Sequence, residues 1–464
     1  MNAQPYRDRR RQLALRLQSA GGGIAILPTA PERPRNGDSD HPFRHDSHFH
    51  HLSGFDEPES WLVLRSDGHS VLFCRSVNAE RAIWEGPRLG PDQAPGVLGV
   101  DEAHPVERLD ELLPALIAQA PAVWSVFAAA DHAGAALSRW LAEARAAGGA
   151  DPARSAGVPH LDLGPLLDEM RLIKDGHELA TMRRAAAISA GAHARAMRFC
   201  GRHFRQHPDS GLHEYEIEAE LLHEFRRHGA QSPAYPSIVA AGANACVLHY
   251  AAGQALLRPG ELCLIDAGCE FDGYASDISR TFPASGRFSA PQRELYEIVL
   301  AAQEAAIAVT RPGARQRDAH HAAVRVLSQG MLDTGLLSRD VFGGVDDVLE
   351  QSAYQRFYMH GTGHWLGRDV HDVGEYLALD EPPSETHDEQ GHTVVKPPSR
   401  PLRPGMVVTL EPGLYVRPAP DVPDRYWNLG IRIEDDAVIT ATGCDLISRG
   451  VPVSVADIEA LMRD

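Results

Sequence analysis

The chain has 464 residues, of which 43% are apolar and 23% are charged. These proportions are typical of a soluble globular protein, and the length exceeds what one ordinary core needs, so two or three domains are expected. The 63 acidic residues outnumber the 45 basic ones and leave a net charge of −18, which disfavours nucleic acid and acidic membrane surfaces as partners. We therefore expect small molecules or peptides as substrates.

Six cysteines are spread along the chain without a C-x-x-C pair, which is typical of reduced, mostly buried thiols in a cytosolic protein. The N-terminal segment is basic but lacks an apolar run followed by a small-residue cleavage site. No stretch has the length and apolarity of a membrane span. The sequence predicts a cytoplasmic protein without a signal peptide.

Residues 1–150 predict an α/β domain. Apolar positions from Tyr6 to Leu17 can line one face of a short basic helix, and the strand-like run IAIL follows at residues 24–27. The next elements expected are strands at 61–64 and 70–74 and alanine-rich helices at 115–120 and 133–147. Gly148 to Pro159 has the composition of a linker, and we place the linker at residues 151–165.

Residues 166–464 predict an α+β domain. One or two long helices are expected from Leu166 to Cys200, where helix-forming residues are almost continuous. The later part alternates between strands, expected at 261–268, 406–416 and 431–440, and helices, expected at 290–309 and 315–332.

The stretch HGTGHWLGRDVHDVG, residues 360–374, holds three histidines among four glycines. His360, His364 and His371 are four and seven residues apart, and the H-E-x-x-H motif of a zincin is absent from the sequence. If these imidazoles serve a metal ion, carboxylates must come from other parts of the chain.

Two such carboxylates flank a predicted hairpin. Asp266 ends the apolar run LCLID, and Asp277 follows the turn signal Asp272-Gly273. A turn near 271/272 would place Asp266 opposite Asp277 on one face, where two like charges repel unless a cation lies between them. Asp272 can be explained as a turn residue, but Asp266 cannot.

Two later strands repeat the pattern. Glu411 follows the run VVTL, and Arg432 and Glu434 share one face of IRIED while Ile431 and Ile433 share the other. A single glutamate at a strand end is usually solvated, but four carboxylates beside apolar strands make a more specific pattern. Four carboxylates and one histidine suit a pair of divalent ions such as Mn²⁺, Co²⁺ or Zn²⁺, and such a pair can drive hydrolysis.

The order Asp, Asp, His, Glu, Glu, together with HGTGHWLGRDVHDVG, TLEPGLY and GIRIEDD, resembles the pita-bread metallopeptidases, the family of methionine aminopeptidase, prolidase and aminopeptidase P. Residues 35–60 are similar to the amino-terminal domain of the aminopeptidase P branch. The resemblance implies an α/β N-terminal domain followed by an α+β pita-bread (creatinase/aminopeptidase-like) catalytic domain. It implies hydrolysis of the bond between an N-terminal residue and a following proline by a metal-bridging hydroxide.

The resemblance also implies residue roles. The five metal ligands would be Asp266, Asp277, His364, Glu411 and Glu434. Asp277 and Glu434 would bridge two divalent ions, with Mn²⁺ expected, and Glu411 would also act as general base. His249, His360 and His371 would orient substrate and stabilise the tetrahedral intermediate, and Arg432 would hold the nearby carboxylates.

The partners implied by the resemblance are peptides with proline at the second position and further copies of the chain, in a dimer or tetramer. Arg35 and Asp38 match a polar loop that reaches toward an active site in the family, expected to be that of a neighbouring subunit. Two alternatives stay open. One is a prolidase, which cleaves only dipeptides, and the other is an inactive pita-bread binding protein, which the loss of any ligand would favour; all five are present.

Two remaining segments fit the resemblance less directly. Four histidines stand close together, and a polar strand is the simpler interpretation of their spacing: His45, His48, His50 and His51. Leu377 to Pro401 is longer than the turn expected in the family, so we predict a mobile surface loop that could narrow the substrate channel, with His387 and His392 exposed.

Overall fold

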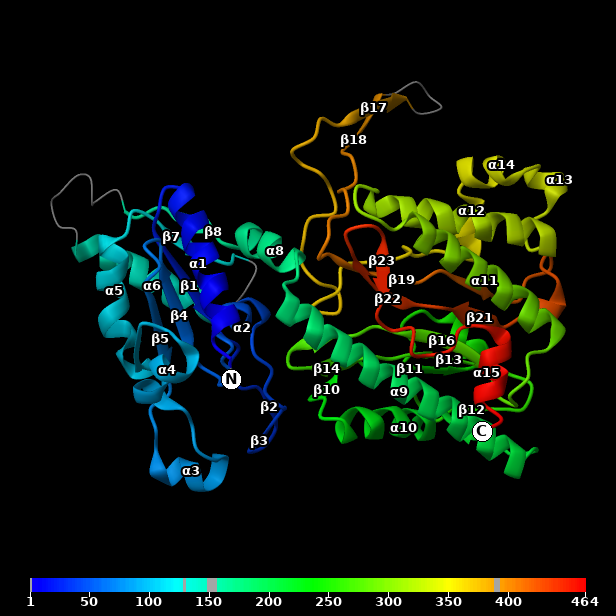
Figure 1. Ribbon diagram of the computed structural model, residues 1–464, viewed down its shortest axis with the longest axis horizontal. Coiled ribbons are helices and arrows are strands. Elements are labelled where there is room, and N and C mark those ends of the chain that lie inside the picture. Colours follow the sequence, from blue (N-terminus) through cyan, green and yellow to red (C-terminus); the bar gives the residue numbers. More distant parts are fainter. Residues whose placement is uncertain (1, 128–130, 148–156, 388–392) are drawn as a thin grey trace. The chain divides into compact units, whose positions relative to one another are not determined.

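The computed structural model describes residues 2–127, 131–147, 157–387 and 393–464 (Figure 1). The chain divides into two compact units, Met1–Arg171 and Leu172–Asp464. The linker predicted at 151–165 is therefore wrong in its second half. Strand β8 (His160–Asp162) pairs in parallel with β7 (Val123–Ser125), and helix α8 (Gly164–Leu172) packs Leu167 into a core of the first unit. Residues 148–156 lie outside the described ranges.

The first unit is an α/β domain built on a six-stranded sheet in the order β6-β5-β4-β1-β7-β8. The strands not yet introduced are β1 (Ile24–Pro28), β4 (Trp61–Arg65), β5 (Ser70–Cys74) and β6 (Glu102–Pro105), so the strands predicted at 24–27, 61–64 and 70–74 are confirmed. The helices are α1 (Gln4–Ser19), α2 (Ser47–Ser53), α3 (Ala79–Glu85), α4 (Gly90–Leu98), the 3₁₀ turn η1 (Val106–Arg108), α5 (Leu109–Gln119) and α6 (Asp131–Ala147).

Both faces of this sheet are buried because side chains alternate along each strand. In β1, Ala25 and Leu27 join the core that contains residues of α1 and α2, whereas Ile24 and Ile26 join the core that contains residues of α5 and α6. The same alternation in β4 and β5 sends every second residue to each core. A helix layer covers each face.

His48, His50 and His51 lie in helix α2, and His45 directly precedes its N-cap residue, so the expectation of a strand here is wrong. The Asp46 side chain caps the helix by accepting a hydrogen bond from the Phe49 backbone N–H at 2.8 Å. Gly54, in the left-handed region with a φ of 64°, ends it. These start and stop signals decide the local structure. Arg35 and Asp38 lie exposed in the hairpin of β2 (Pro34–Asn36) and β3 (Ser39–Asp40).

In the second unit, antiparallel strands lie between two helix pairs (Figure 1). One pair is α9 (Gly176–Gln206) with α10 (Glu214–Arg227), and the other is α11 (Ala290–Val309) with α12 (Gln316–Thr334). The helices predicted at 166–200, 290–309 and 315–332 are confirmed. The shorter elements are the helices α13 (Arg339–Phe342), α14 (Val345–Glu350) and α15 (Val455–Leu461), and the turns η2 (Gly242–Cys246), η3 (Ala353–Arg356) and η4 (Asp424–Tyr426).

The strands of the second unit are short. They are β9 (Leu212–His213), β10 (Ser232–Pro233), β11 (Ile238–Ala241), β12 (Leu256–Leu257), β13 (Leu262–Asp266), β14 (Cys269–Phe271), β15 (Tyr274–Ala275), β16 (Ser279–Pro283), β17 (Ser384–His387), β18 (Thr393–Lys396), β19 (Val407–Leu410), β20 (Gly413–Val416), β21 (Leu429–Arg432), β22 (Asp435–Ile439) and β23 (Cys444–Leu446). Each of the two strands expected at 406–416 and 431–440 is split in two. The breaks fall at Glu411 and Glu434.

The predicted hairpin forms, but its register differs from the prediction. Asp272 and Gly273 both have positive φ values, 47° and 72°, so the turn is centred between them. Asp266 consequently pairs with Ser279 rather than with Asp277. Side chains two residues apart in a strand point to the same face, so Asp277 still projects to the same side of the sheet as Ser279, the residue that pairs with Asp266.

The segment from Leu377 to Pro401 contains a two-stranded ribbon, β17 paired with β18, where we predicted only a loop. Thr393 and the valines that follow it favour an extended backbone because they are β-branched. An isolated bridge between Leu377 and Ser399 closes the base of the ribbon. His392 lies outside the described residues, and so does the side chain of His387.

All six cysteines are free thiols, and five of them are buried. No helix in the described parts of the chain has the length and apolar composition needed to cross a membrane.

Candidate active site

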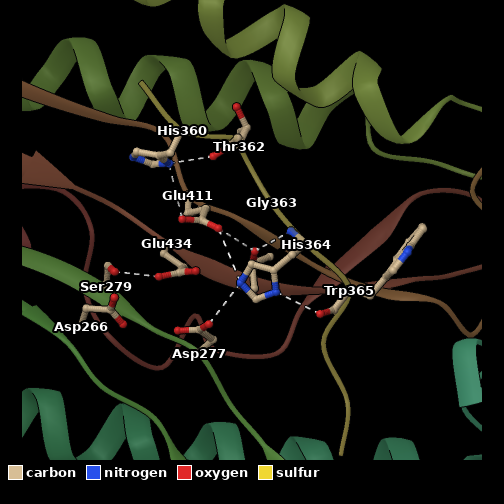
Figure 2. A network of polar contacts seen from close by, with 12 residues as sticks. Asp266, Asp277, Ser279, His360, Thr362, Gly363, His364, Trp365, Glu411 and Glu434 are labelled. Carbon is tan, nitrogen blue, oxygen red and sulfur yellow. Dashed lines mark hydrogen bonds and ion pairs between the residues drawn. The ribbon is translucent and has the colours of Figure 1, made fainter. Parts of the chain in front are cut away.

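A cavity of ≈ 260 Å³ in the second unit brings together every side chain that the sequence predicted for metal binding or catalysis. It is lined by Leu248, His249, Asp266, Asp277, His360, Gly361, Gly363, His364, His371, Glu411, Arg432 and Glu434. These residues come from segments far apart in the sequence, and Figure 2 shows the carboxylates and His364 directed toward one another.

Strand ends place the carboxylates. Asp266 is the last residue of β13, Glu411 follows β19, and Glu434 stands between β21 and β22. The Glu434 backbone N–H donates to the Ser279 carbonyl at 3.0 Å, which joins this break to β16. Ile431 and Ile433 are buried in the core, so Arg432 and Glu434 face the cavity as predicted.

The glycines in residues 360–374 allow this stretch to lie against β19. A Cβ atom on Gly363 would lie 1.9 Å from the Thr409 carbonyl oxygen, so only glycine fits there. The His364 backbone N–H donates to Thr409 Oγ1 at 3.1 Å, and Glu411 N–H donates to the Thr362 carbonyl at 2.9 Å. This close approach delivers the His364 ring to the carboxylates.

A tyrosine and an arginine hold the first two carboxylates. The Tyr235 hydroxyl lies 2.6 Å from Asp266 Oδ1 and 2.5 Å from Asp277 Oδ1. Arg432 donates to Asp266 Oδ2 at 2.6 Å, to Ser279 Oγ at 2.8 Å and to the Tyr415 hydroxyl at 3.0 Å. The side chain of Arg432 is therefore fully engaged at the floor of the cavity.

His364 lies between two carboxylates. Its Nε2 is 3.4 Å from Asp277 Oδ2 and 3.6 Å from Glu411 Oε1, and its Nδ1 is 2.9 Å from the Trp365 carbonyl oxygen (Figure 2). Ligand atoms of Asp277, His364 and Glu434 all lie within 4.8 Å of one another. Although burial lowers it, the pKa of His364 is raised to about 9 by the two neighbouring carboxylates.

The carboxylates carry more negative charge than the protein side chains around them neutralise. Burial and the neighbouring carboxylates raise the pKa of Glu411 to about 7, and they also raise the pKa values of Asp277 and Glu434. Arg432 is the only arginine or lysine among the residues that line the cavity. A cluster of buried oxygen donors with one imidazole and too little positive charge fits divalent cations.

The other three histidines lie around this cluster. His360 Nε2 is 2.8 Å from the Tyr415 hydroxyl, and its Nδ1 is 2.8 Å from the Gly361 carbonyl oxygen and 3.8 Å from Glu411 Oε2. Burial, with a smaller contribution from Arg432, lowers the pKa of His360 to about 4. The His371 ring centroid lies 4.2 Å from that of His364, and burial and neighbouring imidazoles lower the pKa of His371.

Sequence reasoning missed four side chains that organise the site: Tyr235, Ser279, Thr409 and Tyr415. Ser279 Oγ donates to Glu434 Oε2 at 2.6 Å, and Thr409 Oγ1 donates to Glu411 Oε1 at 3.2 Å. These two residues stand two positions from Asp277 and Glu411, so the period of a strand could have identified them. Tyr235 carries no such signal.

Comparisons with known proteins agree with this geometry. The metallopeptidase family M24 matches residues 180–441, and the aminopeptidase P N-terminal domain matches residues 6–124. The chain is 42% identical over 457 residues to the Xaa-Pro aminopeptidase of Escherichia coli strain K12, which covers 98% of this chain and 96% of that protein.

Two solved structures share the whole fold. Aminopeptidase PepP of Pseudomonas aeruginosa is 44% identical, with a TM-score of 0.88 over 100% of this chain and 98% of that chain. Zn-substituted E. coli aminopeptidase P in complex with product is 40% identical, with the same TM-score and the same coverage. The predicted two-domain architecture is confirmed, and the chain belongs to metallopeptidase family M24, in its aminopeptidase P branch.

Proposed function

We propose that this chain is an Xaa-Pro aminopeptidase that hydrolyses the bond between the N-terminal residue of a peptide and a following proline, using two divalent ions, with Mn²⁺ as the first candidate. The observation that carries the proposal is the cluster of four carboxylates and His364, each buried or half-buried, around one cavity. The similarity of almost the whole chain to a protein of that name supports the substrate class.

Five side chains would hold the two ions: Asp266, Asp277, His364, Glu411 and Glu434. When bound, the ions supply activation of a water molecule and polarisation of the peptide carbonyl. Their positive charge would also offset the burial and the mutual repulsion that raise the pKa values of Asp277, Glu411 and Glu434.

The side chains of the protein supply the proton transfers and the orientation. Without metal the pKa of Glu411 is raised to about 7. Ions bound beside it would lower this pKa, so Glu411 would be an unprotonated carboxylate that can accept a proton, which is what a general base requires. His360 and His371 have lowered pKa values and are therefore neutral at that pH, so each ring offers a hydrogen-bond donor or acceptor without adding charge. His249 completes the ring of imidazoles that lines the cavity.

The charges in the cavity favour an aminopeptidase over a prolidase. A dipeptidase must bind the free carboxylate that directly follows proline, which requires a cationic partner. Arg432, the only arginine or lysine among the lining residues, already binds Asp266 and Tyr415. The carboxylates instead suit the positively charged amino terminus of a peptide.

Peptide length decides between the two activities. We expect the metal-reconstituted protein to cleave Xaa-Pro-Yaa tripeptides and longer peptides at the Xaa-Pro bond with higher kcat/KM than Xaa-Pro dipeptides. Acetylation of the N-terminus should abolish cleavage, and Xaa-Ala-Yaa peptides serve as the matched control for the requirement for proline. Turnover of dipeptides alone would identify a prolidase, and the first suspect for closing the channel would then be the ribbon segment from Leu377 to Pro401.

We also propose that the chain acts in the cytoplasm as a homodimer or homotetramer. The free thiols support the cytoplasmic location. The family likeness supports the assembly. Sedimentation equilibrium of the full chain tests the assembly, and a monomer at all concentrations would contradict it.

A further inference from the structure

A second group of potential metal ligands lies in the first unit, around helix α2. Asp46 is the N-cap of this helix, so His45 precedes the cap and His50 is the fourth residue of the helix. Side chains at these two positions commonly pack against each other as an apolar pair. Here the pair consists of two imidazoles, stacked with ring centroids 3.8 Å apart and planes 18° apart.

The turn after α2 brings a carboxylate to both rings. Gly54 ends the helix with a φ of 64°, and a Cβ atom there would lie 2.6 Å from the Tyr6 ring. The chain then returns so that Asp56 Oδ1 lies 2.8 Å from His50 Nε2 and 3.1 Å from His45 Nδ1. Two nitrogen atoms from separate rings thus converge on one oxygen atom.

Burial fixes the two rings and leaves the carboxylate accessible. The side chains of His45 and His50 are only 10% and 6% exposed, whereas that of Asp56 is 65% exposed. Partial burial would raise the pKa of Asp56, but the hydrogen bonds with the two imidazoles hold it below its usual range. The group therefore offers a carboxylate and two fixed imidazoles at neutral pH, with one side open to solvent.

The geometry matches a metal site. One ligand atom from each of the three residues lies within 4.8 Å of the other two. Nitrogen and oxygen ligands bound at about 2.1 Å to a shared ion are themselves about 3.0–3.4 Å apart. The 3.1 Å separation between His45 and Asp56 lies in this range, and the 2.8 Å separation between His50 and Asp56 is slightly shorter, so a small outward shift of the exposed Asp56 side chain would admit the ion. Two imidazoles with one carboxylate and an open position suit borderline transition metals such as Zn²⁺.

We propose that His45, His50 and Asp56 bind one divalent transition-metal ion, with water completing its coordination. The proposed site uses no residue of the catalytic cluster, and the proposal does not depend on the proposed function. It is richer in nitrogen than the catalytic cluster, so it should prefer Zn²⁺ to Mn²⁺ more strongly. The bound ion would connect the start of α2 to the turn after it and would stabilise the first unit.

The test uses the full chain with the double change Asp277→Asn and His364→Ala, which weakens metal binding at the catalytic centre. Calorimetric titration with Zn²⁺ should still show one ion per chain at the new site. Adding His45→Gln, which can keep a hydrogen bond to Asp56, should weaken this binding by roughly tenfold or more because a direct ligand is lost.

The control and the second variant make the result decisive. His104→Gln is the matched control, because His104 also lies beside a carboxylate, with its Nε2 3.3 Å from Glu102 Oε2, and the change should leave Zn²⁺ affinity as it was. Asp56→Asn alters an exposed side chain, so it keeps the fold testable and should also lose the ion. Absence of Zn²⁺ binding, or equal affinity in His45→Gln and His104→Gln, would overturn the proposal and leave a hydrogen-bonded triad.

Discussion

The four histidines of the cavity differ in what each ring touches. His364 Nε2 faces Asp277 and Glu411, and the carboxylates raise its pKa to about 9, so the ring occupies a position that suits a cation. His360 has its ring nitrogens at Tyr415 and at the Gly361 carbonyl, and its pKa is lowered to about 4. One ring is placed to bind metal, and the other is placed to act as a neutral hydrogen-bonding group.

Alanine variants should therefore separate into two classes. We expect His364→Ala to lose metal, whereas His249→Ala, His360→Ala and His371→Ala should keep both ions and lose kcat on the order of 100-fold, because they act on the transition state. Metal content by elemental analysis and steady-state kinetics provide the two measurements.

His321→Ala, on the exposed side of α12, is the control and should change neither quantity. Equal metal loss in all four cavity variants would show that ligand and helper have been confused.

Residues of the site differed in how predictable they were. Asp266 and Glu411 were found because a carboxylate at the end of an apolar strand is unusual, and Asp272-Gly273 because that dipeptide is a hairpin signal. Tyr235 could not be found in this way, since its contact with Asp266 and Asp277 depends on tertiary structure alone. The family likeness supplied the roles, which no spacing reveals.

At the scale of elements, local signals predicted most helices and strands. They did not predict the pairing register of the hairpin, and they gave a strand where helix α2 forms. The strand pairing was wrong by two residues because the turn centre was placed between 271 and 272, whereas the positive φ values put it one residue later. Helix α2 was missed because alternating histidines also fit a strand, although the Asp46 cap and Gly54 gave the opposite signal. Here the capping residues at the two ends decided the secondary structure, and the short alternating pattern of histidines did not.

A buried ion pair joins two segments of the catalytic unit beside the cavity. Lys174 Nζ is 2.9 Å from Asp372 Oδ2, and each side chain is only 1% exposed. Lys174 lies between α8 and α9, and Asp372 directly follows His371. The pair therefore fixes the backbone that carries a catalytic candidate.

Removing the lysine should destabilise the protein and displace His371. Lys174→Met would leave a buried carboxylate without its lysine, which costs about 3–5 kcal/mol in the free energy of unfolding. We expect urea denaturation to show this loss and kinetics to show a lower kcat with metal content retained. The double variant Lys174→Met with Asp372→Leu should recover most of the stability, because an apolar pair can replace a buried ion pair.

The exposed pair between Arg356 and Asp421 is the comparison, with side chains 39% and 66% exposed. Arg356→Met should cost no more than about 1 kcal/mol. Similar losses in Arg356→Met and Lys174→Met would mean that burial does not set the strength of the inner pair.

At the scale of the whole molecule, the clustered carboxyl groups of the catalytic unit make the stability of the protein depend on pH and on metal ions. In the metal-free chain, the pKa of Glu411 is raised from its ordinary 4.5 to about 7, so the folded state holds a proton that the unfolded state releases. Stability from this group is present at acidic pH and is lost as the pH rises from about 4.5 through about 7. Divalent ions would replace such protons, so bound metal and bound protons would compete to neutralise the same carboxylates.

We accordingly predict that the full chain binds two divalent ions at the catalytic centre, that chelators abolish its activity, and that binding releases protons. Below the raised pKa of Glu411 the ions must displace a proton, so their stabilising effect should be smaller there. Differential scanning calorimetry with and without Mn²⁺ should show a larger increase in Tm at about pH 8 than at about pH 6. Calorimetric titration in two buffers of different ionisation enthalpy should measure proton release directly. A Tm increase that is the same at both pH values, or saturation with one Mn²⁺ per chain, would contradict a two-ion site assembled from carboxylates that share protons.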